Sequence, residues 1–185
     1  MTALAILGIS IRDDVLDRDN PAATIVVCGM MLAIGIVYAG ANVGGGPTIW
    51  TTLLPAFAGL IGLGALWLYV EFAGGRVFES ISIDRDVSSA LRLAGLMLGC
   101  AMILGRAAGG NWVSWPQTWD DFASLGWPTI PLALVAAIVH RVLRPTATDP
   151  SPSVLRYGFL PGGLFAAAGF SWIVLRLNGL RPWDW

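Results

Sequence analysis

The sequence predicts an all-α fold, a polytopic membrane helical bundle of about five transmembrane helices that contains a tandem two-helix repeat. The first observation is composition: 56% of the 185 residues are hydrophobic and 12% are charged, whereas soluble domains are about 45–50% apolar and about 25% charged. The second is a series of apolar runs of about 20 residues, the length that a helix needs to cross a bilayer. The third is that one cap-and-helix pattern occurs twice.

The repeated pattern is DNPAATIVVCGMMLAIGIVYAGANVGGG at residues 19–46 and RDVSSALRLAGLMLGCAMILGRAAGGNW at residues 85–112. Each copy has a polar cap, an apolar run and a glycine-rich break, which is the pattern of a membrane helix with both ends marked. A two-helix repeat keeps its orientation, so an axis along the membrane normal would relate the copies. A gapless alignment pairs Asn20 with Asp86, Ala22 with Ser88, Gly29 with Gly95, Met31 with Met97, Leu32 with Leu98, Ala41 with Ala107 and Gly44 with Gly110.

We therefore expect a single integral membrane domain over residues 1–185, with repeat 1 at about 19–73, repeat 2 at about 85–144 and an appended helix at about 155–177. Residues 1–11 are too short to cross a core of roughly 30 Å. They lack the basic region and cleavage site of a signal peptide. We expect an interfacial stub, or the end of a longer helix, followed by a charged segment in water at residues 11–20.

The first helix is predicted over residues 21–41, because Asn20 is a good N-cap and Pro21 suits the first helical position. Residues 42–47 (NVGGGP) end it. The second helix is predicted over 50–72, with Pro55 in its first turns, where a membrane helix tolerates a kink. A polar connection follows at 74–85, and Asp86 caps a third helix over 87–108.

Residues 109–125 are expected to form a long loop rich in Trp. Pro128 opens a fourth helix over 127–143, and the turn residues RPTATDPSPS at 144–153 form a linker. The fifth helix is predicted over 155–177, with an early interruption at the Pro-Gly-Gly of residues 161–163.

Arginine predicts the topology, because positively charged loops remain in the cytoplasm. On the side of the N-terminus lie Arg12, Arg18, Arg76, Arg85, Arg92, Arg141, Arg144 and Arg156, whereas the other side holds only Arg106, Arg176 and Arg181. Most Trp residues fall on that other side, and indoles favour the headgroup level. We expect a multi-pass protein of the bacterial inner membrane with a cytoplasmic N-terminus.

Small residues mark candidate helix contacts. Gly29 and Ala33 in the first helix correspond to Gly95 and Gly99 in the third, and both pairs have the small-xxx-small spacing that lets backbones approach closely. A substrate path between the repeats is the alternative. We expect helix packing, because lipid supplies no hydrophobic drive between helices.

Arg106 is the polar candidate, because charges within spans are costly and often functional. Asp120 and Asp121 are plausible partners in the loop that follows, although Arg106 also lies within snorkelling reach of the outer surface. Arg92 is interpreted as an anchor at the cytoplasmic end. His140 is interpreted as a polar residue at a helix end, with ligation of a haem or pigment as the alternative.

No catalytic, cofactor or metal site is expected. The chain lacks GxSxG, HExxH, Walker and dinucleotide motifs, and Cys28 and Cys100 stand in apolar helices without a CxxC or His-rich context. The net charge of -1 argues against nucleic acid. The expected partners are the lipid bilayer and other membrane proteins or further copies of this chain.

The pattern of Asn20, Ala22, Ala23 and Gly29 resembles the YjfL-like family of small bacterial inner-membrane proteins of unknown function, whose members repeat an Asn-x-Ala-Ala helix start followed by a glycine. The second copy keeps Gly95 but departs at the other positions. The resemblance spans about residues 12–145, and it implies an integral membrane protein without catalytic residues.

Three functions follow from these expectations. The leading one is a scaffold or accessory subunit of a membrane assembly, without enzymatic activity. The alternative is an oligomeric channel or facilitator with a pore between repeats, which depends on whether the small faces are used up within one chain. The third is a membrane enzyme that acts at the outer surface through Arg106, Asp120 and Asp121.

Overall fold

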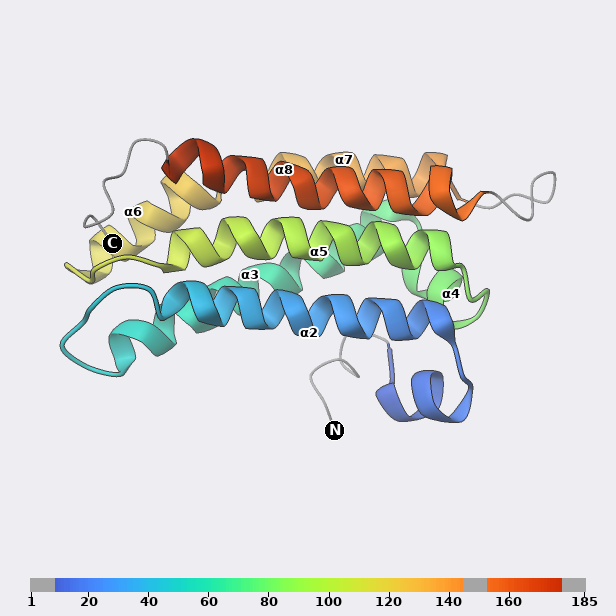
Figure 1. Ribbon diagram of the computed structural model, residues 1–185, viewed down its shortest axis with the longest axis horizontal. Helices are drawn as coiled ribbons and strands as arrows, with labels where there is room; N and C mark the ends of the chain where they lie inside the picture. Colours follow the sequence, from blue (N-terminus) through green and yellow to red (C-terminus); the bar gives the residue numbers. More distant parts are fainter. Residues whose placement is uncertain (1–8, 145–152, 178–185) are drawn as a thin grey trace.

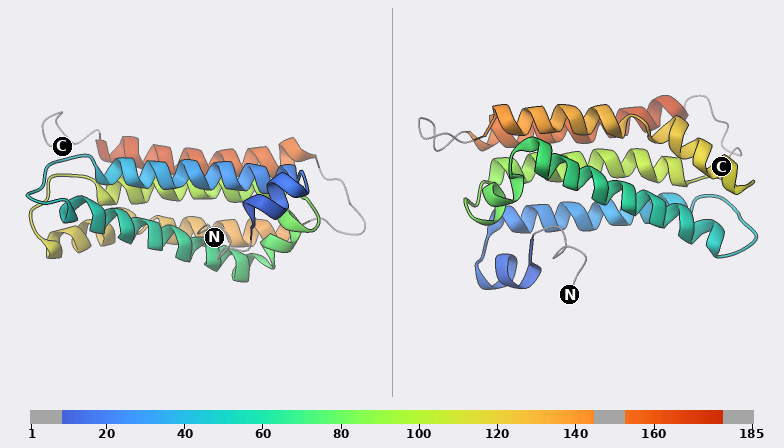
Figure 2. Two further views of the ribbon diagram at one scale, coloured as in Figure 1. Left: turned by 90° about the horizontal axis from the view of Figure 1, so that it is seen from below. Right: turned by 180° about the vertical axis from the view of Figure 1, so that it is seen from behind.

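The chain forms an all-α helical bundle in the computed structural model, which describes residues 9–144 and 153–177. Three helices lie side by side in one layer: α2 (Pro21–Ala41), α5 (Val87–Ala108) in the middle, and α8 (Leu160–Leu177) (Figure 1). A second layer contains α3 (Trp50–Gly74) and α7 (Thr129–Val142), which both pack on α5 (Figure 2). The bundle is therefore built around α5.

Short helices lie at the two ends of the bundle. At the end where α2, α5 and α8 begin lie η1 (Ile11–Asp17), α4 (Val77–Ser82) and η2 (Leu155–Phe159), while α6 (Trp115–Gly126) lies at the opposite end. We call the first the arginine-rich end, since it holds Arg12, Arg18, Arg76, Arg85, Arg92, Arg141, Arg144 and Arg156. We call the second the tryptophan-rich end, since it holds Trp50, Trp112, Trp115, Trp119 and Trp127.

Within the described part of the chain, four helical segments are long and apolar enough to cross a membrane: α2, α3, α5 and the continuous stretch Leu155–Arg176. The pair α6 and α7 is bent by 40° and makes a fifth span if it is counted as one. The chain is therefore a multi-pass membrane protein, as its composition predicts.

The helix starts expected at Asn20 and Asp86 are confirmed. The Asn20 side chain accepts hydrogen bonds from the backbone N–H groups of Ala22 and Ala23 at 3.0 and 3.2 Å. Asp86 does the same for Ser88 and Ser89 at 2.9 and 3.0 Å. These bonds satisfy N–H groups that have no partner inside the helix.

Two segments that were expected to lack helix contain one. The loop expected at residues 109–125 includes α6, because Ser114 accepts a hydrogen bond from the Gln117 N–H and Pro116 occupies the first turn. The connection expected at 74–85 includes α4, whose Phe78 N–H donates to the Glu71 carboxylate at 2.7 Å.

The fifth span continues through the Pro-Gly-Gly triplet instead of breaking there. The irregular part is η2, one turn earlier, where the N–H of Leu160 bonds the carbonyl of Leu155. Pro161 explains this shift, because proline lacks an N–H and its ring clashes with the carbonyl four residues before it, which is that of Tyr157.

Backbone contact at glycines joins the three helices of the first layer. A Cβ on Gly29 would lie 2.6 Å from the Cβ of Ala94, and Gly40 abuts Gly105 further along, so α2 and α5 run parallel. Gly95 and Gly99 of α5 lie against the backbone of α8. As a result, 78% of the most apolar window of α5 is buried, against 44% for α2 and 22% for the fifth span.

Candidate functional site

Apart from Thr129, the buried polar side chains that the structure describes gather at the arginine-rich end. Asn20 is completely buried, and its amide donates to the carbonyls of Ile81 and Ser82 at 2.8 and 3.4 Å while its oxygen caps α2. These carbonyls belong to the last turn of α4, where the helix itself supplies no donor. Asn20 therefore joins the start of α2 to the end of α4.

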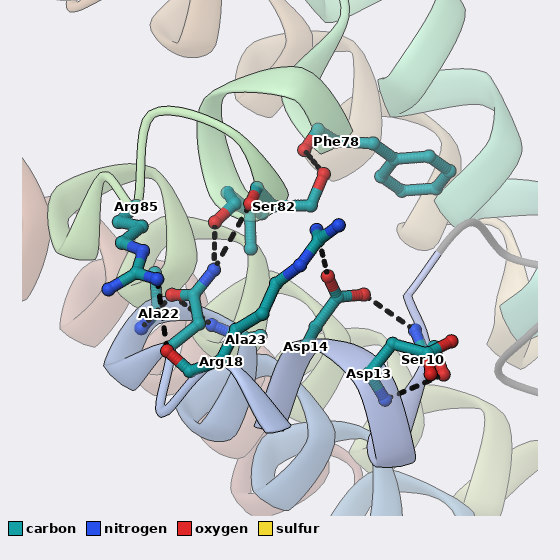
Figure 3. Close-up of polar contacts among 11 residues, drawn as sticks. Ser10, Asp13, Asp14, Arg18, Ala22, Ala23, Phe78, Ser82 and Arg85 are labelled. Atoms are coloured by element: carbon teal, nitrogen blue, oxygen red, sulfur yellow. Dashed lines mark hydrogen bonds and ion pairs between the residues drawn. The ribbon is translucent and has the colours of Figure 1, made fainter. Parts of the chain in front are cut away.

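The segment before α2 is attached by charged groups. Asp14 accepts from the Ser10 N–H at 2.8 Å and from Arg18 Nη1 at 3.2 Å, and Arg85 donates to the Arg18 carbonyl at 2.9 Å (Figure 3). The sequence predicts this segment to sit in water, which is wrong for Asp14, because its side chain is only 8% exposed. The carboxylate satisfies the backbone N–H of Ser10, which is itself partly buried.

Arg92 lies at the centre of a second cluster, and none of its surface is exposed. Its guanidinium donates to the Tyr157 carbonyl, to Ser89 Oγ at 2.8 Å and to His140 Nδ1 at 3.4 Å. Asp86 Oδ2 lies 3.9 Å away and supplies a counter-charge. The cluster thus connects α5 with α7 and with η2.

Pro161 explains why Arg92 donates to the Tyr157 carbonyl. In a regular helix the Tyr157 carbonyl would accept from the N–H of residue 161, which proline does not have. A backbone carbonyl without a donor is costly inside a membrane. Arg92 supplies the missing donor from the neighbouring helix.

Arg92 and His140 were both expected at the membrane surface, and this is wrong. Arg92 is not an anchor in the headgroups, and His140 is 3% exposed rather than a solvated residue at a helix end. Two features of the sequence point to the cluster. Arg92 stands where the first copy of the pattern has Val26, and Pro161 interrupts an apolar helix that needs a donor.

The four predicted packing residues all lie inside the bundle. Gly29 and Ala33 of α2 are buried, and Gly29 contacts Ala94 of α5. Gly95 and Gly99 are buried against α8, where their neighbours include Gly162 and Phe165. They line no cavity described in the structure.

The structure does not bring Arg106 together with Asp120 or Asp121. Arg106 lines an apolar groove of about 170 Å³ between α2, α5 and α8, and its Nη1 donates to the Gly109 carbonyl at 3.3 Å. Asp121 lines a separate cavity beside α3 and α6, where it accepts from Gln117 at 3.1 Å, and Asp120 is exposed. No ion pair joins Arg106 to either carboxylate among the described residues.

The geometry limits what chemistry the described residues can perform. The polar cavity beside Asp121 has a volume of about 30 Å³, and one water needs about 10–15 Å³ on a comparable scale. A third, larger groove of about 410 Å³ between α3 and α7 is almost wholly apolar. Within residues 9–144 and 153–177, no group of three His, Cys, Asp or Glu side chains could hold a metal ion.

Together, these apolar spans and internal polar clusters define a helical integral membrane protein. The model of the family described as Domain of Unknown Function (DUF350) matches residues 6–108, more than half of the chain, and the chain belongs to this family. The match ends with α5, whereas the resemblance noted in the sequence implied a limit near residue 145. No curated protein and no solved structure matches the chain.

Proposed function

We propose that this chain is a non-enzymatic scaffold or accessory subunit of an assembly in the bacterial inner membrane. In this proposal its N-terminus is cytoplasmic, and its partners are the bilayer, other membrane proteins and further copies of itself. Within DUF350, we assign it to the YjfL-like group on the Asn-x-Ala-Ala helix start of α2.

The observation that carries the proposal is that the faces of the predicted packing residues in the two repeats are used up within one chain. Gly29, Gly95 and Gly99 lie in backbone contact between α2, α5 and α8. A pore between the repeats would require these faces to separate and admit water, and close packing would then be lost. The contact therefore favours a static scaffold over the alternative of a channel.

Two further observations support the proposal. The described charged side chains buried in the bundle, such as Arg92, are hydrogen-bonded to backbone and neighbouring side chains, which is a structural use of polarity. The enzyme alternative needs Arg106 to act with Asp120 and Asp121, but Arg106 and Asp121 line different cavities, and no ion pair among the described residues joins Arg106 to either carboxylate.

Isolation of the tagged full-length chain from its own host, at native expression and in mild detergent, tests the proposal. We expect other membrane proteins to co-purify in a fixed ratio, and an unrelated multi-pass protein with the same tag should not enrich them. The proposal fails if the chain purifies without other proteins and if liposomes that contain it gain a selective flux. That result would establish the channel alternative.

A further inference from the structure

The contacts α2–α5 and α5–α8 share one register. Gly29 of α2 lies against Ala94 of α5, and Gly95 of α5 lies against Gly162 of α8. Gly29 and Gly95 are equivalent in the repeat alignment, so α2 and α5 present the same face to the helix that follows. The row of three parallel helices is therefore a head-to-tail arrangement, in which each contact joins two different faces.

The last helix of the row has the same face, but no helix of the described chain covers it. When Gly162 is matched with Ala94, Gly163 and Ala167 of α8 correspond to Gly95 and Gly99 of α5. Gly163 and Ala167 are exposed, as is Ser171 four residues on, and a Cβ on Gly163 would meet no atom within 4 Å. We call these three residues the α8 outer face.

The first helix of the row has the complementary face, which is also exposed. The residues of α5 that face α2 include Ala94 and Gly105, and Ala101 lies between them in helical spacing. Their equivalents in α2 are Cys28, Ala39 and Gly35, which we call the α2 outer face. A Cβ on Gly35 would meet no atom within 4 Å.

We propose that the α8 outer face of one copy packs on the α2 outer face of a second copy, so that the helix row continues from chain to chain. The argument is continuity with an existing interface: the same contact occurs twice inside the chain, and both of its faces remain open at the ends. Small residues allow the close backbone approach on which helix association in lipid depends.

This geometry specifies the kind of oligomer. The two outer faces differ, so the contact is heterologous, and each copy binds one neighbour through α8 and another through α2. Every copy keeps its orientation in the bilayer, so the repeated contact closes into a ring about the membrane normal or extends as a row. The inference concerns self-association alone and goes beyond the scaffold proposal.

A disulfide test uses the native thiol of Cys28, which is exposed, while that of Cys100 is buried. By the shared register, Gly163→Cys places a second thiol opposite Cys28 of the neighbouring copy. Glycine-type helix contacts bring Cα atoms within the roughly 4.4–6.8 Å that a disulfide spans. The full-length variant, reconstituted in nanodiscs or kept in membranes, is oxidised with copper phenanthroline and run on a non-reducing gel.

We expect a reducible ladder that passes beyond the dimer, since every copy carries both thiols. Cys28→Ser in the Gly163→Cys background should abolish it. Leu164→Cys is the matched control, because Leu164 is exposed at the same depth but points about 100° away on the helix. The Leu164→Cys variant should give less than a tenth of the cross-linked product that Gly163→Cys gives.

The inference is overturned if no cross-link forms, if only a dimer forms that survives Cys28→Ser, or if Leu164→Cys cross-links equally well. Native mass spectrometry of the unaltered protein gives a second measurement, and a monomer at every concentration would also overturn it. A monomer that still co-purifies with other membrane proteins would leave the scaffold proposal standing.

Discussion

Arg92 illustrates how one missing N–H determines the place of a charged residue. A buried guanidinium is costly in a membrane, but here it donates to the Tyr157 carbonyl and has the Asp86 carboxylate 3.9 Å away as a counter-charge. Removal of the arginine leaves the Tyr157 carbonyl without this donor, and a buried unsatisfied group costs about 1–3 kcal/mol. The effect of Arg92 on stability therefore depends on Pro161.

The first prediction is that Arg92→Met lowers the free energy of unfolding by about 1–3 kcal/mol, and that Pro161→Ala reduces this loss. Alanine at 161 restores the N–H that bonds the Tyr157 carbonyl, so the arginine is then less needed. A double-mutant cycle on thermal or denaturant unfolding in detergent measures the coupling, with an expected magnitude of about 0.5–2 kcal/mol.

Arg156→Met is the matched control for this cycle, because Arg156 lies on η2 and is exposed. It should change stability by less than about 0.5 kcal/mol. Equal losses from Arg92→Met with and without Pro161 would show that the arginine does not act on the carbonyl of Tyr157.

Asn20 is a residue whose single side chain connects two elements. It caps α2 and also bonds the end of α4, so its loss affects four hydrogen bonds in a buried place. The second prediction is that Asn20→Ala destabilises the protein by about 1–3 kcal/mol, measured by unfolding in detergent. Asn42→Ala removes one exposed bond to the Tyr38 carbonyl and should cost less than about 0.5 kcal/mol; equal costs would contradict the prediction.

At the scale of elements, α5 meets α2 and α8 by close backbone approach at glycines. Gly95 lies against Gly162, and a side chain there would separate α5 from α8. The third prediction is that Gly95→Leu overpacks this contact and costs about 1–3 kcal/mol or more, with the same direction for Gly29→Leu. The melting temperature in detergent measures it.

Gly64→Leu provides the control for the third prediction, since Gly64 lies in the middle of α3 and a Cβ there meets no atom within 4 Å. Leucine favours helix over glycine by roughly 0.5–1 kcal/mol, so this variant should match or exceed wild-type stability. If Gly95→Leu and Gly29→Leu had the melting temperature of the wild type, the packing of the three parallel helices would be different from that described.

At the scale of the whole molecule, the distribution of charge along the bundle predicts its orientation. The fourth prediction is that a thiol at the arginine-rich end reacts from the cytoplasm and a thiol at the tryptophan-rich end reacts from outside. Ser153→Cys and Val113→Cys place thiols at exposed positions of the two ends. Labelling of intact cells and of inverted vesicles with an impermeant maleimide, in a Cys28→Ser background, measures which side each faces.

Labelling of Val113→Cys from the cytoplasm would reverse the proposed orientation. Because the two ends of the bundle lie on opposite sides of the membrane, this result would also place the arginine-rich end and its polar clusters outside the cytoplasm. Oligomer formation does not depend on this outcome, since the disulfide test compares copies with one another and not with the two sides of the membrane.

The sequence by itself determined the local features of this protein. The lengths of the apolar runs predicted the spans, and Asn20 and Asp86 predicted where α2 and α5 begin. These features depend on residues within one or two turns of each other, so a linear pattern contains them. The cap at Ser114 was equally local, and the Trp-rich composition around it favoured a loop where α6 forms.

The tertiary structure alone decided which residues meet. Two contacts join residues that are far apart in sequence: Arg92 with His140, and Asn20 with Ile81. Both contacts depend on the packing of whole helices. The same holds for Arg106, which lines a different cavity from Asp121, one of its two expected partners. A charged residue near a helix end has the same sequence pattern whether it faces water or a neighbouring backbone, because only the packed helices determine which acceptor lies within reach.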